Sequence, residues 1–136
     1  MSEVEHIAKT LAFPVVVLPN VAALSTESAI RFLVERLKQD GSLPAESADE
    51  IVSSVLKRES LGSTALGGGA ALPHGTHSAI DRVLGILARS SSSIPWESPD
   101  GQPVVTICLI LAPVDRPGDY GRVLENVAQA MKGKRG

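Results

Sequence analysis

A nearly continuous apolar run from Val104 to Leu111 places the strongest constraint on how this chain can fold. The run has the length of an ordinary strand, and a strand that is apolar along almost its whole length is buried on both faces. It contains Cys108, the single cysteine of the chain, which has no internal disulfide partner and is expected to pack as a small core residue. The sequence therefore predicts a central strand that is covered on both sides.

Shorter apolar segments alternate with stretches of helical periodicity. Runs rich in β-branched residues predict strands, whereas apolar residues repeated every three or four positions predict helices. One helix is expected to be capped by Ser25 or Thr26 and stopped by Gly41. The expected strands cover residues 13–18, 70–72, 83–88 and 104–111, and the other expected helices cover residues 45–58 and 118–131.

This alternation is typical of an α/β protein, here a single layered domain with a mixed β-sheet flanked by helices. A length of 136 residues suits one domain with its own core. We assign residues 13–136 to that domain and expect residues 1–12, which include His6, to form a loose N-terminal segment. The serine run from Ser90 to Ser93 is expected to be a solvated loop after the strand over 83–88.

The charge balance argues against two classes of partner. The chain has 13 Lys and Arg against 15 Asp and Glu, a formal net charge of −2, so nothing attracts it to nucleic acid or to an acidic membrane. Its apolar runs are too short to span a bilayer, and the N-terminus lacks the order of a signal peptide. With the lone cysteine, these features predict a cytoplasmic protein that meets its partners through a local patch.

Residues 57–75 form the most distinctive stretch of the chain. Five glycines and several hydroxyl side chains surround the approach to His74, which stands between Pro73 and Gly75. Glycine tolerates positive φ and lets backbone N–H groups approach an anion closely, and proline restricts the backbone beside the histidine. The stretch therefore predicts a loop that holds an anion near a histidine in a defined position.

The chemistry that this setting favours is phosphoryl transfer through His74. An imidazole with a pKa of about 6.5 is largely neutral near pH 7, and its unprotonated nitrogen is a nucleophile. The hydroxyls of Ser63 and Thr64 and the guanidinium of Arg58 can stabilise the charge that develops on a phosphoryl group. The alternative is that His74 only caps a strand in a glycine-rich loop.

The same stretch matches a longer pattern, consisting of Arg58-Glu59, Leu61-Gly62-Ser63-Thr64, Gly67, Gly69 and Leu72-Pro73-His74-Gly75. This pattern resembles the enzyme IIA domain of the fructose, mannitol and nitrogen-regulatory (type 2) branch of the bacterial phosphoenolpyruvate-dependent phosphotransferase system. The resemblance extends over nearly the whole chain from about residue 13. It implies that His74 is the phosphorylated residue and that Arg58 lies beside it.

The resemblance also implies the partners. The phosphoryl donor would be the histidine phosphocarrier protein, and the acceptor would be a IIB component or a regulatory protein that responds to the phosphorylation state. No metal and no cofactor is expected, because the transfer runs between two protein side chains.

Two departures from the family pattern concern the end of the chain. Family members usually have a second histidine at the start of the last helix, where this sequence has Tyr120-Gly121. Members also usually continue past that helix, so this domain is expected to be C-terminally short. Tyr120 is therefore a candidate site residue, and the alternative function is a non-catalytic regulatory or interaction module on the same fold.

Three other patterns suggest further sites or roles. His74, His77 and Asp81 could form a metal site, although a flexible loop would crowd these ligands and the usual zinc set would be incomplete. The glycines 67–69 suggest a nucleotide loop, but no Gly-Lys-Ser/Thr follows them. Glu59 either orients the loop or Arg58, or is an exposed carboxylate at a helix end.

Overall fold

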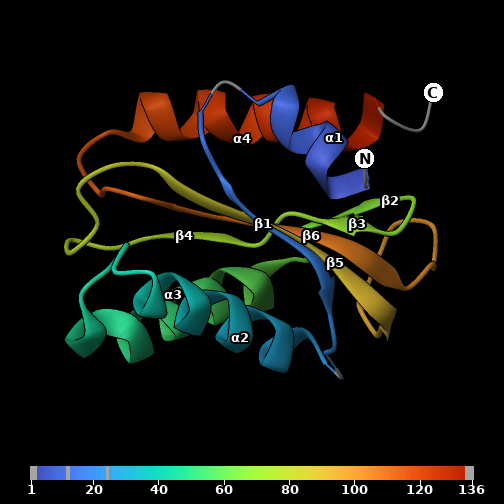
Figure 1. Cartoon of the computed structure of the whole chain (residues 1–136), viewed down its shortest axis with the longest axis horizontal. Helices are drawn as coiled ribbons and strands as arrows, with labels where there is room; N and C mark the ends of the chain where they lie inside the picture. The colour runs from blue at the N-terminus through green and yellow to red at the C-terminus, as the bar shows by residue number, and fades with distance from the viewer. Residues whose placement is uncertain (1–2, 12, 24, 134–136) are drawn as a thin grey trace.

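The computed structural model describes residues 3–11, 13–23 and 25–133 and shows one sheet between two layers of helices (Figure 1). The α/β class and the mixed sheet that the sequence predicts are confirmed. In chain order the elements are α1 (Glu3–Lys9), β1 (Val16–Val21), α2 (Thr26–Gln39), the 3₁₀ turn η1 (Ala45–Ser47), α3 (Ala48–Leu61), β2 (Ala65–Gly67), β3 (Ala70–Ala71), β4 (His74–Thr76), β5 (Leu84–Ile94), β6 (Val104–Ala112) and α4 (Pro117–Gly133).

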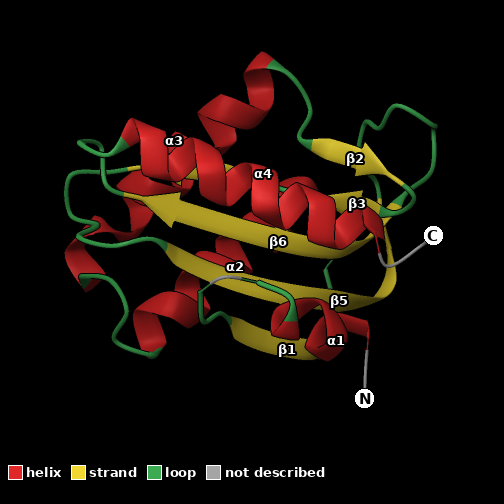
Figure 2. Ribbon diagram, turned by 90° about the horizontal axis from the view of Figure 1, so that it is seen from above, coloured by secondary structure: helices red, strands yellow, loops and turns green. Residues whose placement is uncertain are grey.

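The sheet has the strand order β1-β5-β6-β3-β2, and β4 also pairs with β6. β5 and β6 are antiparallel and form the centre of the sheet, whereas β1 runs parallel to β5 and both β3 and β4 run parallel to β6 (Figure 2). β3 and β4 follow one another along the same side of β6, since Ala70 pairs with Thr106 and His74 pairs with Ile110. His74 therefore begins a short strand at the edge of the sheet.

The strand β6 is buried on both faces, as its sequence predicts. Helices α2 and α3 cover one face of the sheet, and α1 and α4 cover the other (Figure 1). Ile107 and Leu109 belong to the hydrophobic cluster on the α2/α3 side, whereas Cys108 and Ile110 belong to the cluster on the α1/α4 side. Burial raises the pKa of the Cys108 thiol to about 12, so this cysteine is an inert core residue.

The first long strand is displaced from its expected position. The sequence predicts it over 13–18, but β1 covers Val16–Val21 and includes Pro19, which was expected to lie beyond it. Proline is tolerated there because β1 pairs only with β5 and lies at the edge of the sheet, where one side of the strand needs no ladder donors. The pairing with β5 shifts register between Leu18 and Val21, next to this proline.

The prediction of a solvated loop at Ser90–Ser93 is wrong. These serines continue β5, which extends to Ile94. Val21 of β1 pairs with Ser90, and Ile94 pairs with Val104 of β6 and is fully buried, so the intervening residues must stay extended. Tertiary pairing overrides a low strand propensity here. Three of the four serines are exposed, and only Ser90 is buried.

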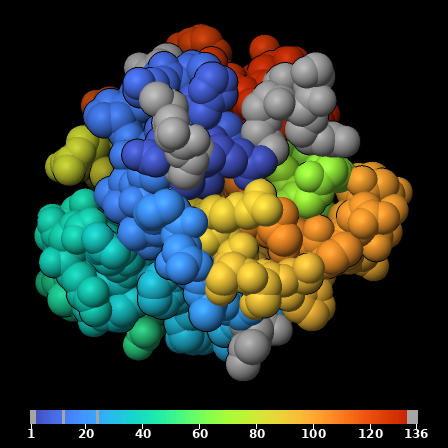
Figure 3. Space-filling model, turned by 45° about the vertical axis from the view of Figure 1, so that its right-hand side comes forward, coloured from blue at the N-terminus to red at the C-terminus, as the bar shows by residue number. Residues whose placement is uncertain are grey.

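The expectation of a loose segment over residues 1–12 is also wrong for the residues of α1, which include His6. Val4 and Ile7 are 0% and 1% exposed and pack into the cluster on the α1/α4 face of the sheet. Glu3 binds Arg89 on β5, with 2.6 Å between Oε1 and Nη1. In the space-filling view the N-terminal residues, in blue, lie against the body of the molecule (Figure 3). Residues 1, 2 and 12 lie outside the described residues.

The helices follow the predicted pattern with small differences at their ends. Ser25 is the N-cap of α2, and its hydroxyl accepts a hydrogen bond from the backbone N–H of Ser28 at 3.0 Å. After α2 the chain turns at Gly41, which has a φ of +77°. Helix α3 begins after a 3₁₀ turn and continues to Leu61, so Arg58 lies in its last turn.

Candidate active site

A cavity of about 330 Å³ opens where the edge strand β4 meets both helical layers. Helix α3 contributes Ser54 and Arg58, β4 contributes His74 and its two successors, and the first turn of α4 contributes Tyr120. Three of the five predicted site residues, which are Arg58, His74 and Tyr120, therefore line one cavity. The other two, Ser63 and Thr64, are not among the residues that line it.

The position of His74 results from an interruption between β3 and β4. Leu72 and Pro73 stand between the two strands, and Pro73 still continues the contact with β6, because its carbonyl accepts from the N–H of Ile110 at 3.1 Å. The carbonyl of Leu72 is directed to the histidine and lies 2.8 Å from its Nδ1. The predicted strand over 70–72 is thus confirmed at 70–71, and His74 begins the next strand.

The hydrogen bond to Leu72 fixes the tautomer of the imidazole. A carbonyl oxygen only accepts, so Nδ1 of His74 carries the proton and Nε2 keeps its lone pair. Burial lowers the pKa of His74, and the positive charge of Arg58 lowers it further, whereas the Leu72 carbonyl and Glu59 act in the opposite direction. The net effect favours a neutral ring whose nucleophilic nitrogen is Nε2.

Arg58 is held at the end of α3 by the loop that follows the helix. Its Nη1 donates a hydrogen bond to the carbonyl of Gly62 at 2.6 Å. This bond occupies one N–H of a planar fork whose remaining donors match the geometry of phosphate oxygens. The guanidinium and the imidazole of His74 line the same cavity, and this is the arrangement that an incoming anion requires.

Tyr120 places a phenol beside the imidazole. The rings of Tyr120 and His74 meet edge to face, with centroids 5.8 Å apart and an interplanar angle of 68°. Burial raises the pKa of Tyr120 to about 12, against a smaller opposing effect of Arg58. The phenol therefore keeps its proton at neutral pH and remains a hydrogen-bond donor.

The hydroxyls of Ser63 and Thr64 are bonded within the protein. Ser63 donates to the carbonyl of Glu97 and accepts from the N–H of Ala65 at 3.1 Å. Thr64 is buried, and its hydroxyl donates to Oε1 of Glu59 at 2.6 Å. Both side chains thus hold the loop between α3 and β2.

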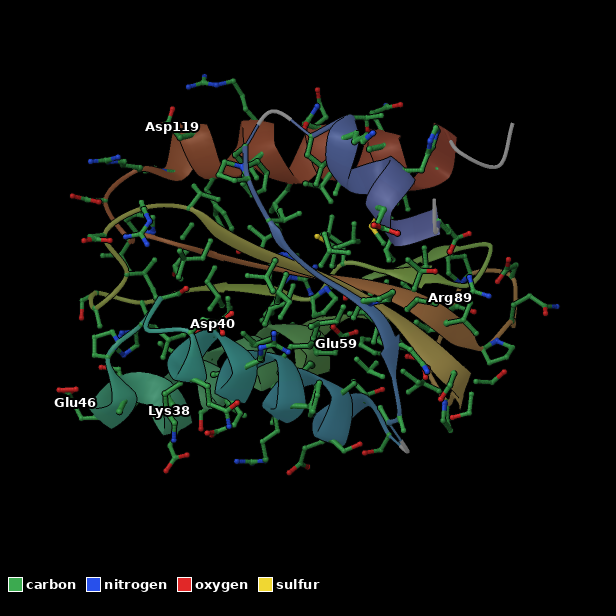
Figure 4. All side chains as sticks on the ribbon, viewed as in Figure 1. Lys38, Asp40, Glu46, Glu59, Arg89 and Asp119 are labelled. Carbon is green, nitrogen blue, oxygen red and sulfur yellow. The ribbon has the colours of Figure 1, made fainter. Side chains whose placement is uncertain are left out.

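Glu59 organises this loop, and the alternative of an exposed helix-end carboxylate is wrong, because the residue is only partly exposed and both of its carboxylate oxygens accept hydrogen bonds. Its Oε2 accepts from the backbone N–H of Thr64 at 2.8 Å and from Nε1 of Trp96 at 2.9 Å. Glu59 lies on the side of the sheet that α2 and α3 cover, whereas Asp119 lies at the start of α4 on the opposite side (Figure 4). Trp96 follows β5 far along the chain, so no local sequence signal indicates this contact.

Ser54 is a site residue that the sequence reasoning missed. It lies one helical turn before Arg58 and lines the cavity, and its hydroxyl donates to the carbonyl of Thr76 at 3.1 Å. The helix can approach this closely because Gly75 has no side chain: a Cβ there would lie 3.0 Å from Val55 Cγ2. The helical spacing of Ser54 and Arg58 was the available signal.

The glycine turn at Gly67–Gly69 connects β2 to β3 and faces a different anion. All three glycines have positive φ, of 88°, 65° and 82°. The N–H of Gly68 donates to the carboxylate of Asp100 at 2.7 Å, and this bond is the first cause of the lowered pKa of Asp100. The negative group that this turn holds in the structure is thus a side chain of the protein itself.

The histidines of the candidate metal site face different partners. His77 Nε2 lies 2.8 Å from the carboxylate of Glu50 on α3, whereas His74 is bonded to Leu72. Within residues 3–11, 13–23 and 25–133 no three His, Cys, Asp or Glu side chains gather as metal ligands would.

Across the same ranges, none of the helices combines the length and hydrophobicity that crossing a membrane requires.

Comparison with known proteins identifies relatives of similar sequence. A "Nitrogen regulatory protein" of Bradyrhizobium diazoefficiens is 34% identical over 122 residues, which cover 90% of this chain and 78% of the relative. The 2-O-alpha-mannosyl-D-glycerate-specific EIIABC component of the Escherichia coli phosphotransferase system is 38% identical over 93 residues, which cover 68% of this chain and 14% of that protein.

Solved structures of similar fold also include a nitrogen-regulatory protein and a sugar-specific IIA protein. The crystal structure of nitrogen regulatory protein IIA-Ntr from Neisseria meningitidis superposes with a TM-score of 0.74 and 30% identity, covering 90% of this chain and 81% of the other. The crystal structure of IIA mannitol from Escherichia coli superposes with a TM-score of 0.64 and 25% identity, covering 81% and 77%. The model of the family described as "Phosphoenolpyruvate-dependent sugar phosphotransferase system, EIIA 2" matches residues 13–135, and this chain belongs to that family.

Proposed function

We propose that the protein is a phosphocarrier that receives a phosphoryl group on Nε2 of His74 from the histidine phosphocarrier protein. The lone pair of Nε2 attacks the phosphorus, the N–P bond of the donor breaks, and its electron pair returns to the donor imidazole. One observation carries this proposal: the imidazole of His74, whose Nδ1 is bonded to the Leu72 carbonyl, lines a cavity shared with Arg58, which leaves Nε2 as the available nucleophile. In a second exchange the group passes to a IIB component or a regulatory protein.

The neighbouring side chains have separate roles in this proposal. Arg58 offers its remaining N–H donors to the oxygens of the phosphoryl group, on which negative charge is concentrated. The phenol of Tyr120 donates one further hydrogen bond without adding charge. Ser63 and Thr64 contribute by holding the loop, because their hydroxyls are bonded to Glu97 and Glu59.

A regulatory use of the phosphorylation state is favoured over bulk sugar transport. Proteins named for nitrogen regulation match most of this chain, as the relative from Bradyrhizobium diazoefficiens does. A neutral phenol at position 120 gives less electrostatic help than a cationic imidazole, which suits a slow signal better than a rapid flux. The same residue, Tyr120, supports the second candidate function, a non-catalytic interaction module.

A cytoplasmic location accords with the unpaired thiol of Cys108.

The test is direct phosphorylation. The protein is incubated with phosphoenolpyruvate, the first enzyme of the system and the histidine phosphocarrier protein, and its mass is measured. We expect one phosphoryl group that is labile in acid and stable in alkali. His74→Ala should abolish the mass increase and leave the protein folded. Uptake of one phosphoryl group by folded His74→Ala would refute the assignment, and no uptake by the wild type would support the interaction module.

A further inference from the structure

We propose that Glu59 is a positioning residue of the phosphoryl site, because a chain of hydrogen bonds leads from its carboxylate to the imidazole of His74. The inference rests on the phosphoryl transfer proposed above. Glu59 does not line the cavity, so it acts through other residues and not by touching the transferred group.

The first link joins Glu59 to Thr64. One carboxylate oxygen accepts from the Thr64 hydroxyl at 2.6 Å and the other from the Thr64 backbone N–H at 2.8 Å. The second oxygen also accepts from Nε1 of Trp96. Thr64 and Trp96 are 7% and 9% exposed, so water has little access to replace these partners. The three donors hold the carboxylate in place, and the two that come from Thr64 fix the position and the rotation of Thr64.

The second link joins Thr64 to the histidine through a single residue, Leu72. The carbonyl of Thr64 accepts from the N–H of Leu72 at 3.1 Å, and the carbonyl of Leu72 binds Nδ1 of His74 at 2.8 Å. Leu72 lies outside the regular pairing of β3 and β4 with β6, so these bonds help to determine the direction of its carbonyl. Displacement of Thr64 therefore loosens the bond that selects the His74 tautomer.

The same loop also reaches Arg58. Glu59 follows Arg58 in the last turn of α3, and Arg58 donates to the carbonyl of Gly62 in the loop that Glu59 anchors at Thr64. One carboxylate thus stabilises a loop that contacts the phosphate-binding guanidinium at one end and the reactive imidazole, through Leu72, at the other. The opposite effects of Arg58 and Glu59 on the pKa of His74 agree with their closeness to the ring.

The experiment compares three variants in the full chain. Glu59→Ala removes all three acceptor contacts. Glu59→Gln keeps them without the charge, because its amide oxygen can accept from two donors while its NH₂ donates to the Thr64 hydroxyl. Glu97→Ala is the control, since Glu97 is exposed and only its backbone carbonyl contacts Ser63. For each variant the thermal unfolding, the initial rate of His74 phosphorylation and the ¹⁵N NMR signals of the imidazole are measured.

We expect Glu59→Ala to slow phosphorylation by up to about 10²-fold, the scale of a misplaced reacting group, and to populate the Nε2–H tautomer of His74. Glu59→Gln should recover most of the rate and the single Nδ1–H tautomer, and Glu97→Ala should match the wild type. A folded Glu59→Ala with an unchanged rate and tautomer would overturn the proposal, as would Glu59→Gln being equally slow.

Two further arms keep the result interpretable. If Glu59→Ala does not fold, Thr64→Val replaces it, because that change removes only the hydroxyl bond. It should slow transfer and mix the tautomers, and a wild-type rate would overturn the proposal. If the wild type accepts no phosphoryl group, the proposed function fails by itself, whereas the tautomer signals of the same variants still decide whether Glu59 positions His74.

Discussion

The histidine end and the glycine turn of the stretch 57–75 differ in what they face, although both have the composition of an anion-binding loop. His74 opens into a cavity with Arg58 and has a nucleophilic nitrogen available. The turn at Gly67–Gly69 has its positive-φ backbone directed at the carboxylate of Asp100. In the proposed function the histidine end accepts an external anion, whereas the glycine turn already holds an internal one.

This difference teaches that glycine content alone does not locate a ligand. Three successive glycines are needed where the chain reverses between β2 and β3, because side chains are strained at positive φ. The Asp100 carboxylate then stabilises the turn. The histidine end instead brings together one fixed imidazole and one guanidinium, and its glycine, Gly75, allows close packing against α3.

The sharpest way to test the histidine end is Arg58→Lys. Lysine keeps the charge but loses the planar fork that binds two phosphate oxygens together. We expect phosphoryl transfer to slow by roughly 10²-fold, as on loss of a main stabilising donor, with thermal unfolding little changed. The measurement is the initial rate with a phosphorylated donor protein. Near-normal kinetics would mean that the guanidinium only closes the end of α3 through Gly62.

A smaller effect on phosphoryl transfer is expected from substitution of Tyr120, whose ring packs edge to face against the imidazole of His74. Tyr120→Phe removes the phenol donor and should slow transfer by less than the ~10²-fold typical of a principal donor, whereas Tyr120→His should accelerate it, because an imidazole can carry positive charge. Rates of phosphorylation and dephosphorylation are measured for all three side chains. Equal rates would show that Tyr120 only packs against His74.

The pH dependence tests the neutral state of His74. Burial, followed by the charge of Arg58, lowers its pKa, so the ring should remain unprotonated as the pH falls through about 6.5. The unfolded chain takes up this proton first, so the contribution of His74 to stability is present above that pH and is lost below it. NMR titration should give a midpoint below 6.5, and Arg58→Gln should raise it. A midpoint at or above about 6.5 would contradict the assigned environment.

The smallest effect on transfer is expected at the glycine turn. Gly69→Ala places a side chain at a φ of +82°, with its Cβ 3.3 Å from Val105. Left-handed backbone costs about 1–2 kcal/mol for an L-residue, so the free energy of unfolding should fall by that amount or more while transfer stays unchanged. Gly41→Ala, at a φ of +77° in open space, is the matched control for strain without contact. A folded Gly69→Ala with impaired transfer would place the turn in the phosphoryl site.

The fold could be predicted where the sequence pattern is local. The apolar run of β6 and the capped, amphipathic α2 were found because burial and capping leave periodic signals. The extension of β5 through Ser90 and the packing of α1 against the sheet could not be predicted, because both depend on residues that are distant in the sequence. Val21 and Val104 hold the serines extended, and Arg89 on β5 holds the short α1 through Glu3.

The candidate site shows the same division. His74 and Arg58 were indicated by the motif and Tyr120 by its departure from the family pattern, and the structure brings all three to one cavity. The role of Glu59 could not be decided from the sequence. Its partners Thr64 and Trp96 lie on other segments, and a hydrogen-bond acceptor leaves no signal in the sequence periodicity.

The bond between Trp96 and Glu59 gives the protein an optical reporter of its own. Trp96 is the only tryptophan in the sequence, so the indole emission of the protein comes from one place. Its Nε1 touches the carboxylate that anchors the loop beside His74, and charged neighbours shift the emission of an indole. The fluorescence of the unlabelled protein therefore reports on this loop, and we expect it to change on the proposed phosphorylation of His74, so that the reaction can be followed without an added dye.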